Sequence, residues 1–219
     1  MENLNLVLPE IFISLSIMFL LVLGVFKKDS SKLIFNISLL VLLITATITL
    51  NETSNINRTT LFNNSVVIDY MSSLMKIITL VGAFLVLVIS SNYLKIFKIF
   101  KIEYPILILS SVLGMMVMIS SNDLMVFYIG LELQSLALYV LATFNRDQLK
   151  SSEAGLKYFV LSALSSGLLL YGCSLIYGFS GSTNFDIISN QLNSTNYVLT
   201  FGIVFILVGL AFKISAVPF

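Results

Sequence analysis

The stretch FYIGLELQSLALYV (residues 127–140) carries a single carboxylate, Glu132, in an otherwise uncharged run. No basic residue lies within ten positions of Glu132 on either side. An unpaired carboxylate is costly to bury in a soluble core and costlier in hydrocarbon. How informative Glu132 is therefore depends on whether this run lies in a soluble core or in a membrane.

The composition indicates a membrane. Hydrophobic residues make up 58% of the 219 residues and charged residues only 11%, with a mean hydropathy of +1.01. These values exclude a soluble enzyme. A net charge of +1 with scattered basic residues argues against a nucleic-acid partner. The chain has no histidine and one cysteine, Cys173, expected in the core, so no metal site is predicted.

Seven apolar segments are long enough to cross the hydrocarbon core, which requires about 20 residues. We therefore predict an all-α polytopic membrane protein with about seven transmembrane helices. The last segment ends at Phe219 without a closing loop, and Pro218 fits a break in a longer span. We expect the sequence to be the N-terminal part of a longer protein. The predicted spans are residues 5–26, 33–50, 70–92, 104–121, 124–142, 153–178 and 197–219.

The basic residues between these spans predict the orientation. Eight lie in the odd-numbered loops, and only Arg58 lies in an even-numbered one. By the positive-inside rule, the odd loops are cytoplasmic and the N-terminus is periplasmic. The acidic start of the chain is the reverse of a secretory signal peptide, so the first span is expected to be retained. The eight residues are Lys27, Lys28, Lys32, Lys95, Lys98, Lys101, Arg146 and Lys150.

Glu132 lies near the middle of the fifth predicted span and belongs to a polar stripe. Helical spacing places four side chains on one face, which must point at protein or water: Tyr128, Glu132, Ser135 and Tyr139. The natural partner is Lys213, deep in the seventh span, because Gly202 and Gly209 on the same face let another helix approach. A carboxylate that moves relative to a buried lysine can control whether the lysine holds its proton. The pair predicts a proton relay; the alternatives are a structural carboxyl and a lysine that reaches the membrane surface.

The other charges in the spans are more ambiguous. Lys157 stands four residues after Glu153, so a helical ion pair and a functional role are equally compatible with its position. Asp69 and Lys76 share one face of the third span and are expected to help pair it with its neighbours.

Two further positions and one set of small residues are expected to be structural. Glu10 and Asp123 lie at span ends, where we expect them to face water. In the sixth span, the small-residue pairs Ser162/Ser166 and Ala163/Gly167 predict close helix packing.

Three blocks resemble a known family: YIGLELQSLALYVLATFNR (128–146), SSEAGLKYFVLSALSSGLLLYG (151–172) and GLAFKISAVPF (209–219). They are similar to subunit N of the proton-pumping NADH–quinone oxidoreductase, respiratory complex I, in its alphaproteobacterial form. The resemblance implies an antiporter-like fold in the cell inner (plasma) membrane. Residues 1–103 would form three leading helices and residues 104–219 part of the first inverted repeat, cut within a discontinuous helix.

The resemblance also implies a site. The family's proton-relay residues match Glu132, Lys213 and Lys157, and the implied partners are the lipid bilayer and the other membrane subunits of complex I. NADH, FMN, iron–sulfur clusters and quinone would belong to other subunits, with no redox chemistry and no direct NADH binding in this chain. Two alternatives stay open: a subunit of a multisubunit sodium/proton antiporter, and a non-transporting membrane scaffold.

Overall fold

The computed structural model describes residues 4–27, 31–53, 58–97, 99–191 and 197–216. Six helices in these ranges are long and apolar enough to cross a membrane, and a seventh apolar helix, α8, is shorter. The predicted polytopic helical fold is confirmed, while Pro218 lies outside the described residues. The elements in chain order are η1 (Leu4–Val7), α1 (Leu8–Phe26), α2 (Ser31–Thr53), β1 (Thr59–Leu61), β2 (Val66–Ile68), α3 (Tyr70–Ile96), α4 (Glu103–Ser120), α5 (Leu124–Ala142), α6 (Leu149–Ser180), α7 (Phe185–Gln191) and α8 (Tyr197–Lys213).

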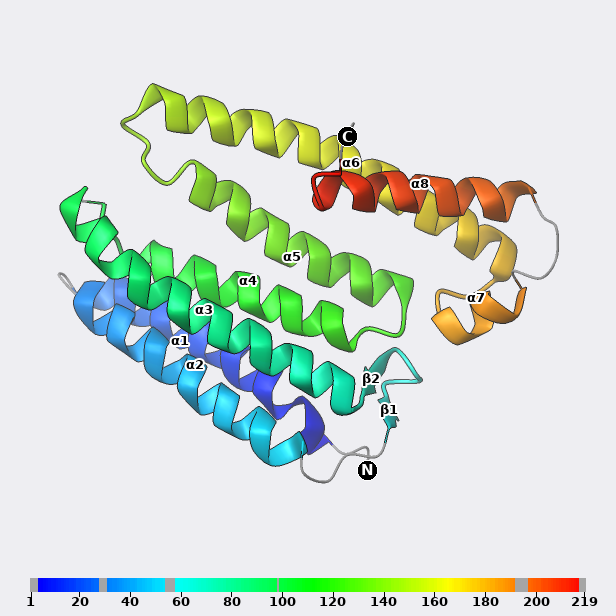
Figure 1. Ribbon diagram of the computed structural model, residues 1–219, viewed down its shortest axis with the longest axis horizontal. Coiled ribbons are helices and arrows are strands. Elements are labelled where there is room, and N and C mark those ends of the chain that lie inside the picture. Colours follow the sequence, from blue (N-terminus) through cyan, green and yellow to red (C-terminus); the bar gives the residue numbers. More distant parts are fainter. Residues whose placement is uncertain (1–3, 28–30, 54–57, 98, 192–196, 217–219) are drawn as a thin grey trace.

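The helices form two groups that meet along α4 and α5 (Figure 1). Helices α1 to α4 enclose one hydrophobic core, which includes Ile13, Leu80 and Leu109. Helices α5, α6 and α8 enclose a second, which includes Leu169 and the predicted core residue Cys173. Many large apolar side chains point outward from these bundles, as expected where lipid replaces water.

Two aspartates begin helices and so have local structural roles. Asp69 caps α3: its carboxylate accepts a hydrogen bond from the Ser72 N–H at 2.7 Å, and the Ser72 hydroxyl accepts one from the Asp69 N–H at 2.9 Å. Asp123 caps α5 by accepting from the Met125 N–H at 2.8 Å, and it also accepts from the Thr183 hydroxyl. Such caps satisfy N–H groups that a helix start leaves free.

The expectation for Glu10 needs correction, whereas the expectation that Lys76 pairs the third span with a neighbouring helix is confirmed. Asp69 caps its own helix, and Glu10 is buried and does not face water. Instead, the Lys76 ammonium lies 2.6 Å from a Glu10 carboxylate oxygen, with both side chains buried. The ion pair joins α3 to α1. The position of Glu10 near a helix end did not reveal this role, because the contact with α3 forms only in the folded bundle, where α1 also packs against α2 and α4.

A small hairpin between α2 and α3 contains the two β-strands of the described ranges. Strands β1 and β2 pair antiparallel, with Thr59 opposite Ile68. Residues Phe62, Asn63 and Asn64 have positive φ angles at the tip, a conformation that asparagine tolerates better than most residues. The hydropathy pattern did not predict either the hairpin or the short helix α7.

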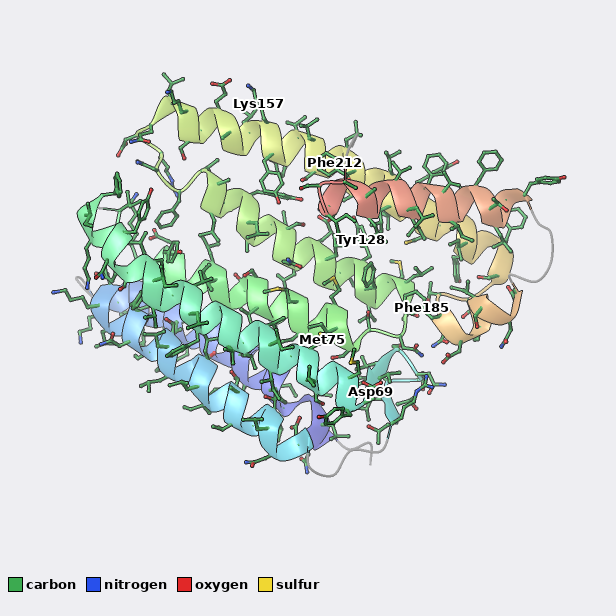
Figure 2. The ribbon with its side chains drawn as sticks, in the orientation of Figure 1. Asp69, Met75, Tyr128, Lys157, Phe185 and Phe212 are labelled. Atoms are coloured by element: carbon green, nitrogen blue, oxygen red, sulfur yellow. The ribbon has the colours of Figure 1, made fainter. Side chains whose placement is uncertain are left out.

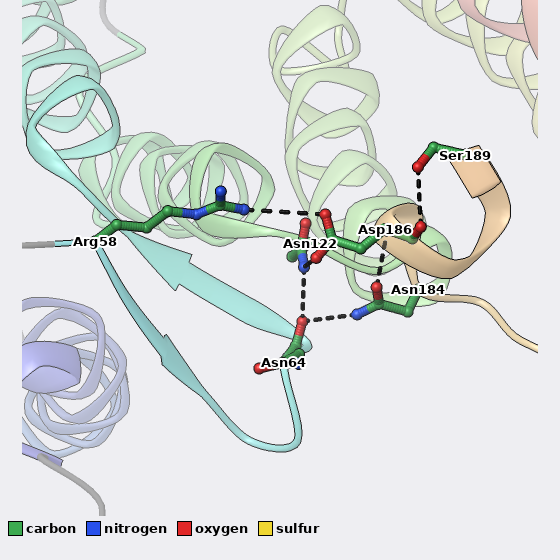
Figure 3. A network of polar contacts seen from close by, with 6 residues as sticks. All are labelled: Arg58, Asn64, Asn122, Asn184, Asp186 and Ser189. Carbon is green, nitrogen blue, oxygen red and sulfur yellow. Dashed lines mark hydrogen bonds and ion pairs between the residues drawn. The ribbon is translucent and has the colours of Figure 1, made fainter.

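A polar network holds the hairpin against the two neighbouring connections (Figure 3). The Asn122 amide, in the α4–α5 turn, donates to the Asn64 carbonyl at 3.0 Å and to the Asp186 carboxylate of α7 at 3.1 Å. The Asn184 amide donates to the same Asn64 carbonyl at 2.9 Å, and Arg58 lies 3.9 Å from Asp186. The network therefore ties three segments together at one end of the helices.

Glycines set the closest helix contacts. A Cβ on Gly130 of α5 would lie 2.8 Å from the Met118 nitrogen and 2.9 Å from the Gly114 carbonyl of α4. The predicted close face of α8 is confirmed, since a Cβ on Gly202 would lie 2.9 Å from Ile176 and one on Gly209 2.7 Å from Leu169, both in α6.

The small residues of α6 divide between two faces. Ser162 and Ser166 are buried, as predicted. The prediction for Ala163 and Gly167 was wrong, because both lie on the exposed face of α6, and a Cβ on Gly167 would meet nothing within 4 Å.

The glycine contact between α4 and α5 predicts opposite effects for one substitution at two sites. Gly130→Ala should lower the free energy of unfolding by about 1–3 kcal/mol, because the new methyl group forces the backbones apart. Gly82→Ala on the open face of α3 should raise it by about 0.5–1 kcal/mol, since alanine favours a helix. Unfolding of both variants by a denaturing detergent measures the difference. Equal effects at the two sites would contradict the close contact.

Candidate functional site

Glu132 and Lys213 meet between α5 and α8. The Lys213 ammonium lies 3.4 Å from a Glu132 carboxylate oxygen, and the side chains are 12% and 21% exposed. The same ammonium donates a hydrogen bond to the Tyr139 hydroxyl at 2.8 Å. The end of α8, marked by Phe212 in Figure 2, thus lies beside the middle of α5. The structure brings together the two residues that the sequence paired.

Tyr139 has a larger role than its place in the polar stripe suggested. Its ring packs edge-on against Tyr158 and Phe159 of α6, with centroids 4.8 and 5.8 Å away. The Lys213 nitrogen lies 5.5 Å from the centre of the same ring. Tyr139 therefore fixes the ammonium from one side while α6 fixes the tyrosine. Its spacing of seven residues from Glu132, two helical turns, is the pattern that could have identified it.

The remaining stripe residues contribute less to the pair. The Ser135 hydroxyl donates to the Glu132 main-chain carbonyl at 3.1 Å, within its own helix. Tyr128, labelled in Figure 2, is half-buried on α5 one turn before Glu132. No contact between either side chain and Lys213 is seen in the described residues.

The backbone after Lys213 explains why α8 stops there. Ser215 has a φ angle of 55°, in the left-handed region. Its N–H donates to the Phe212 carbonyl at 3.0 Å, and the Ala216 N–H donates to the Ala211 carbonyl at 2.9 Å. These two bonds form a Schellman motif, which closes a helix and satisfies its last carbonyl groups. Lys213 consequently sits at the negative end of the helix dipole, which favours its ammonium.

Lys157 is not part of the Glu132–Lys213 contact. Its ammonium lies 2.6 Å from Glu153, one turn earlier in α6, and the two side chains are 67% and 56% exposed. Figure 2 shows Lys157 on the side of α6 away from α5. The following residue, Tyr158, does reach the site by packing on Tyr139. The described part of the chain holds no group of three or more histidine, cysteine, aspartate or glutamate residues arranged for a metal ion.

The buried pair should behave differently from the exposed pair in double-mutant cycles. For Glu132→Gln with Lys213→Met we expect a coupling of about 1–3 kcal/mol in the free energy of unfolding, because each single change leaves a largely buried charge without its counter-charge. For Glu153→Gln with Lys157→Met we expect about 0.3–0.5 kcal/mol, as for exposed pairs on one helix. Detergent unfolding of all six variants measures both couplings. Equal couplings would show that burial adds nothing at Glu132 and Lys213.

Comparison with known proteins shows which proteins this chain resembles. Residues 121–219 match the family described as NADH:quinone oxidoreductase/Mrp antiporter, TM. NADH-quinone oxidoreductase subunit N of Pelagibacter ubique is 73% identical over all of this chain and 46% of the relative. The Bartonella bacilliformis protein of the same name is 53% identical over 99% of this chain and 45% of the relative.

Solved structures of two membrane complexes contain chains with a similar fold. A chain of respiratory complex I from Thermus thermophilus with bound aureothin matches 96% of this chain and 45% of its own length, with a TM-score of 0.79 and 25% identity. A chain of the Mrp complex from Dietzia sp. matches with a TM-score of 0.78 at 21% identity, covering 99% and 42%, and shares the fold. The chain spans a little under half the length of these relatives. Along its whole length the chain is similar to NADH-quinone oxidoreductase subunit N, and its antiporter-like membrane segment matches the NADH:quinone oxidoreductase/Mrp antiporter family.

Proposed function

We propose that this chain belongs to a membrane-arm subunit of proton-pumping NADH–quinone oxidoreductase in the bacterial inner membrane. Its part in that complex would be to carry protons through Glu132, Lys213 and Lys157. The observation that carries the proposal is the largely buried contact between Lys213 and Glu132, whose charged atoms are 3.4 Å apart although the two residues are 81 positions apart in sequence. The relatives, which are named NADH-quinone oxidoreductase subunit N, support the choice of this complex as the place where the contact works.

The geometry of the pair suggests how a proton is held and released. At an effective dielectric constant of 20, the attraction across 3.4 Å is about 5 kcal/mol, and it falls to about 2.4 kcal/mol at 7 Å. Movement of Glu132 away from Lys213 therefore weakens the hold of the site on the ammonium proton. The Tyr139 hydroxyl keeps its hydrogen bond to Lys213 meanwhile, so the nitrogen stays in place while its charge changes.

Lys157 would take the next step toward the cytoplasmic side. It has to leave Glu153 to do so, and an exposed ion pair on one helix costs only about 0.3–0.5 kcal/mol to break. We propose further that residues 1–103 are leading helices and residues 104–219 part of an inverted repeat, with the N-terminus periplasmic. Electron transfer from NADH through FMN and iron–sulfur clusters to quinone would occur in partner subunits, without redox chemistry or NADH binding in this chain.

The Mrp-like fold supports a second candidate, a subunit of a sodium/proton antiporter. The two candidates differ in the driving reaction: proton uptake that requires NADH oxidation and ignores sodium favours the first. Uptake that follows a sodium gradient favours the second. A membrane scaffold, the third candidate, predicts no transport change in any assembled variant.

Neutralising the pair should stop proton transport without preventing assembly. We expect Glu132→Gln and Lys213→Met, in the full-length subunit within the assembled complex, to lower NADH-driven proton uptake roughly tenfold or more, as for the loss of a proton-transfer group. Electron transfer to quinone should fall in parallel if the reactions are coupled. Both rates are measured in the same membrane vesicles after the complex is quantified.

The matched control is Glu103→Gln, which removes an exposed carboxylate at the start of α4. It should leave both rates unchanged. Assembled Glu132→Gln and Lys213→Met complexes that pump at the normal rate would mean that the pair is structural.

A second comparison distinguishes a role of the Lys157 ammonium in transport from a role of its ion pair with Glu153. Lys157→Met should lower proton uptake if the ammonium carries protons, whereas Glu153→Gln removes the partner and leaves the ammonium in place. We therefore expect a loss of at least severalfold in the first variant and little change in the second. Equal proton uptake in the two variants would remove Lys157 from the relay.

A further inference from the structure

Helices α1 and α3 share a buried ion pair that the proposed relay does not use. The Lys76 and Glu10 side chains are 3% and 10% exposed, and their nitrogen and oxygen atoms are 2.6 Å apart. They lie in the α1–α4 group, and α4 separates them from Glu132 and Lys213. The pair on its own is neutral and would need no further ligand.

A third charged group changes this balance. Glu52, at the end of α2, is close enough to interact electrostatically with both Glu10 and Lys76. The cluster of Glu10, Lys76 and Glu52 thus combines two carboxylates with one ammonium, which leaves one negative charge in excess. An excess charge in a low-dielectric surrounding is costly, so a counter-charge is favoured.

One oxygen of the cluster also lacks a hydrogen-bond donor. Glu10 Oε2 is buried and has no partner among the described residues, whereas Oε1 is held by Lys76. An unsatisfied buried acceptor costs about 1–3 kcal/mol. A proton on one of the two carboxylates would neutralise the excess charge and, as an O–H group, supply a donor.

No other described charge nearby offers compensation. Asp69 is occupied as the cap of α3, and Arg58 lies beside Asp186. Tyr70 at the start of α3 is exposed. The remaining charged residues in the described parts of α1 to α4 lie at the opposite ends of these helices; the nearest on α4 is Glu103, in its first turn.

We propose that Glu10, Lys76 and Glu52 form a second proton-binding site, which holds one proton on its carboxylates at neutral pH and exchanges it with the adjacent aqueous phase. Access comes through Glu52, which is only half-buried and is the second-last residue of α2. Glu10 is the third residue of α1, so the cluster lies close to the helix ends. The site is independent of the transport role proposed for Glu132 and Lys213.

Infrared spectroscopy of the full-length subunit in lipid vesicles tests the site directly. A protonated carboxyl group gives a C=O stretching band that a carboxylate lacks. At neutral pH we expect this band in the parent protein, its loss in Glu52→Gln, and its retention in the control Glu103→Gln. Lys76→Met should retain the band, because Glu52 then lacks the cation that favours its charged form.

Glu52→Gln still tests the proposal if Lys76→Met folds poorly, because the half-buried Glu52 side chain can be replaced by an amide without disturbing the core. A parent band that is absent at neutral pH, or equal in Glu52→Gln and the parent, would overturn the proposal. Loss of the band on addition of sodium ions would also overturn it, because the carboxylates would then be a cation site. None of these readouts depends on NADH oxidation or proton pumping.

Discussion

The structure depends on the requirement that each charge inside the bundle has a partner of opposite sign. Among the described residues, the ammonium of Lys76 is buried and that of Lys213 is largely buried, and each is matched by a carboxylate on a different helix: Lys76 with Glu10, and Lys213 with Glu132. Unpaired, either would cost several kcal/mol in hydrocarbon. Each pair therefore fixes two helices that are distant in sequence, one pair in each helix group.

These pairs can form only because the helices approach closely. Lipid is as apolar as leucine, so packing and not hydrophobicity draws membrane helices together. Gly130 brings α5 onto α4, and Gly202 and Gly209 bring α8 onto α6. Tyr139 then bridges α5 to α6 through Tyr158, and its hydroxyl receives the Lys213 ammonium. The position of the candidate site is thus a consequence of glycine contacts outside it.

The sequence predicted what depends on local hydropathy and missed what depends on distant contacts. Spans and the Glu132–Lys213 pair followed from apolar runs and from the cost of a charge at mid-depth. The prediction for Glu10 was wrong because a residue near a helix end is expected to face water, and the sequence does not show which helices pack around it. The hairpin was missed because its tip is held by Asn122, 58 residues away from Asn64. No periodicity within a window of the sequence encodes such a bond.

The two buried pairs differ in a way that separates their roles. Lys213 has a second partner in Tyr139, and the Glu132 carboxylate lies 3.4 Å from it, whereas Lys76 is paired with Glu10 at 2.6 Å. Glu132 can withdraw without stranding the ammonium, because Tyr139 retains it. Withdrawal of Glu10 would leave the Lys76 charge with the more distant, half-buried Glu52 as compensation. A movable carboxylate thus suits α5, whereas the Glu10–Lys76 contact has to stay closed, so that the exchange proposed for the α1–α3 cluster involves a proton and not a moving Glu10 side chain.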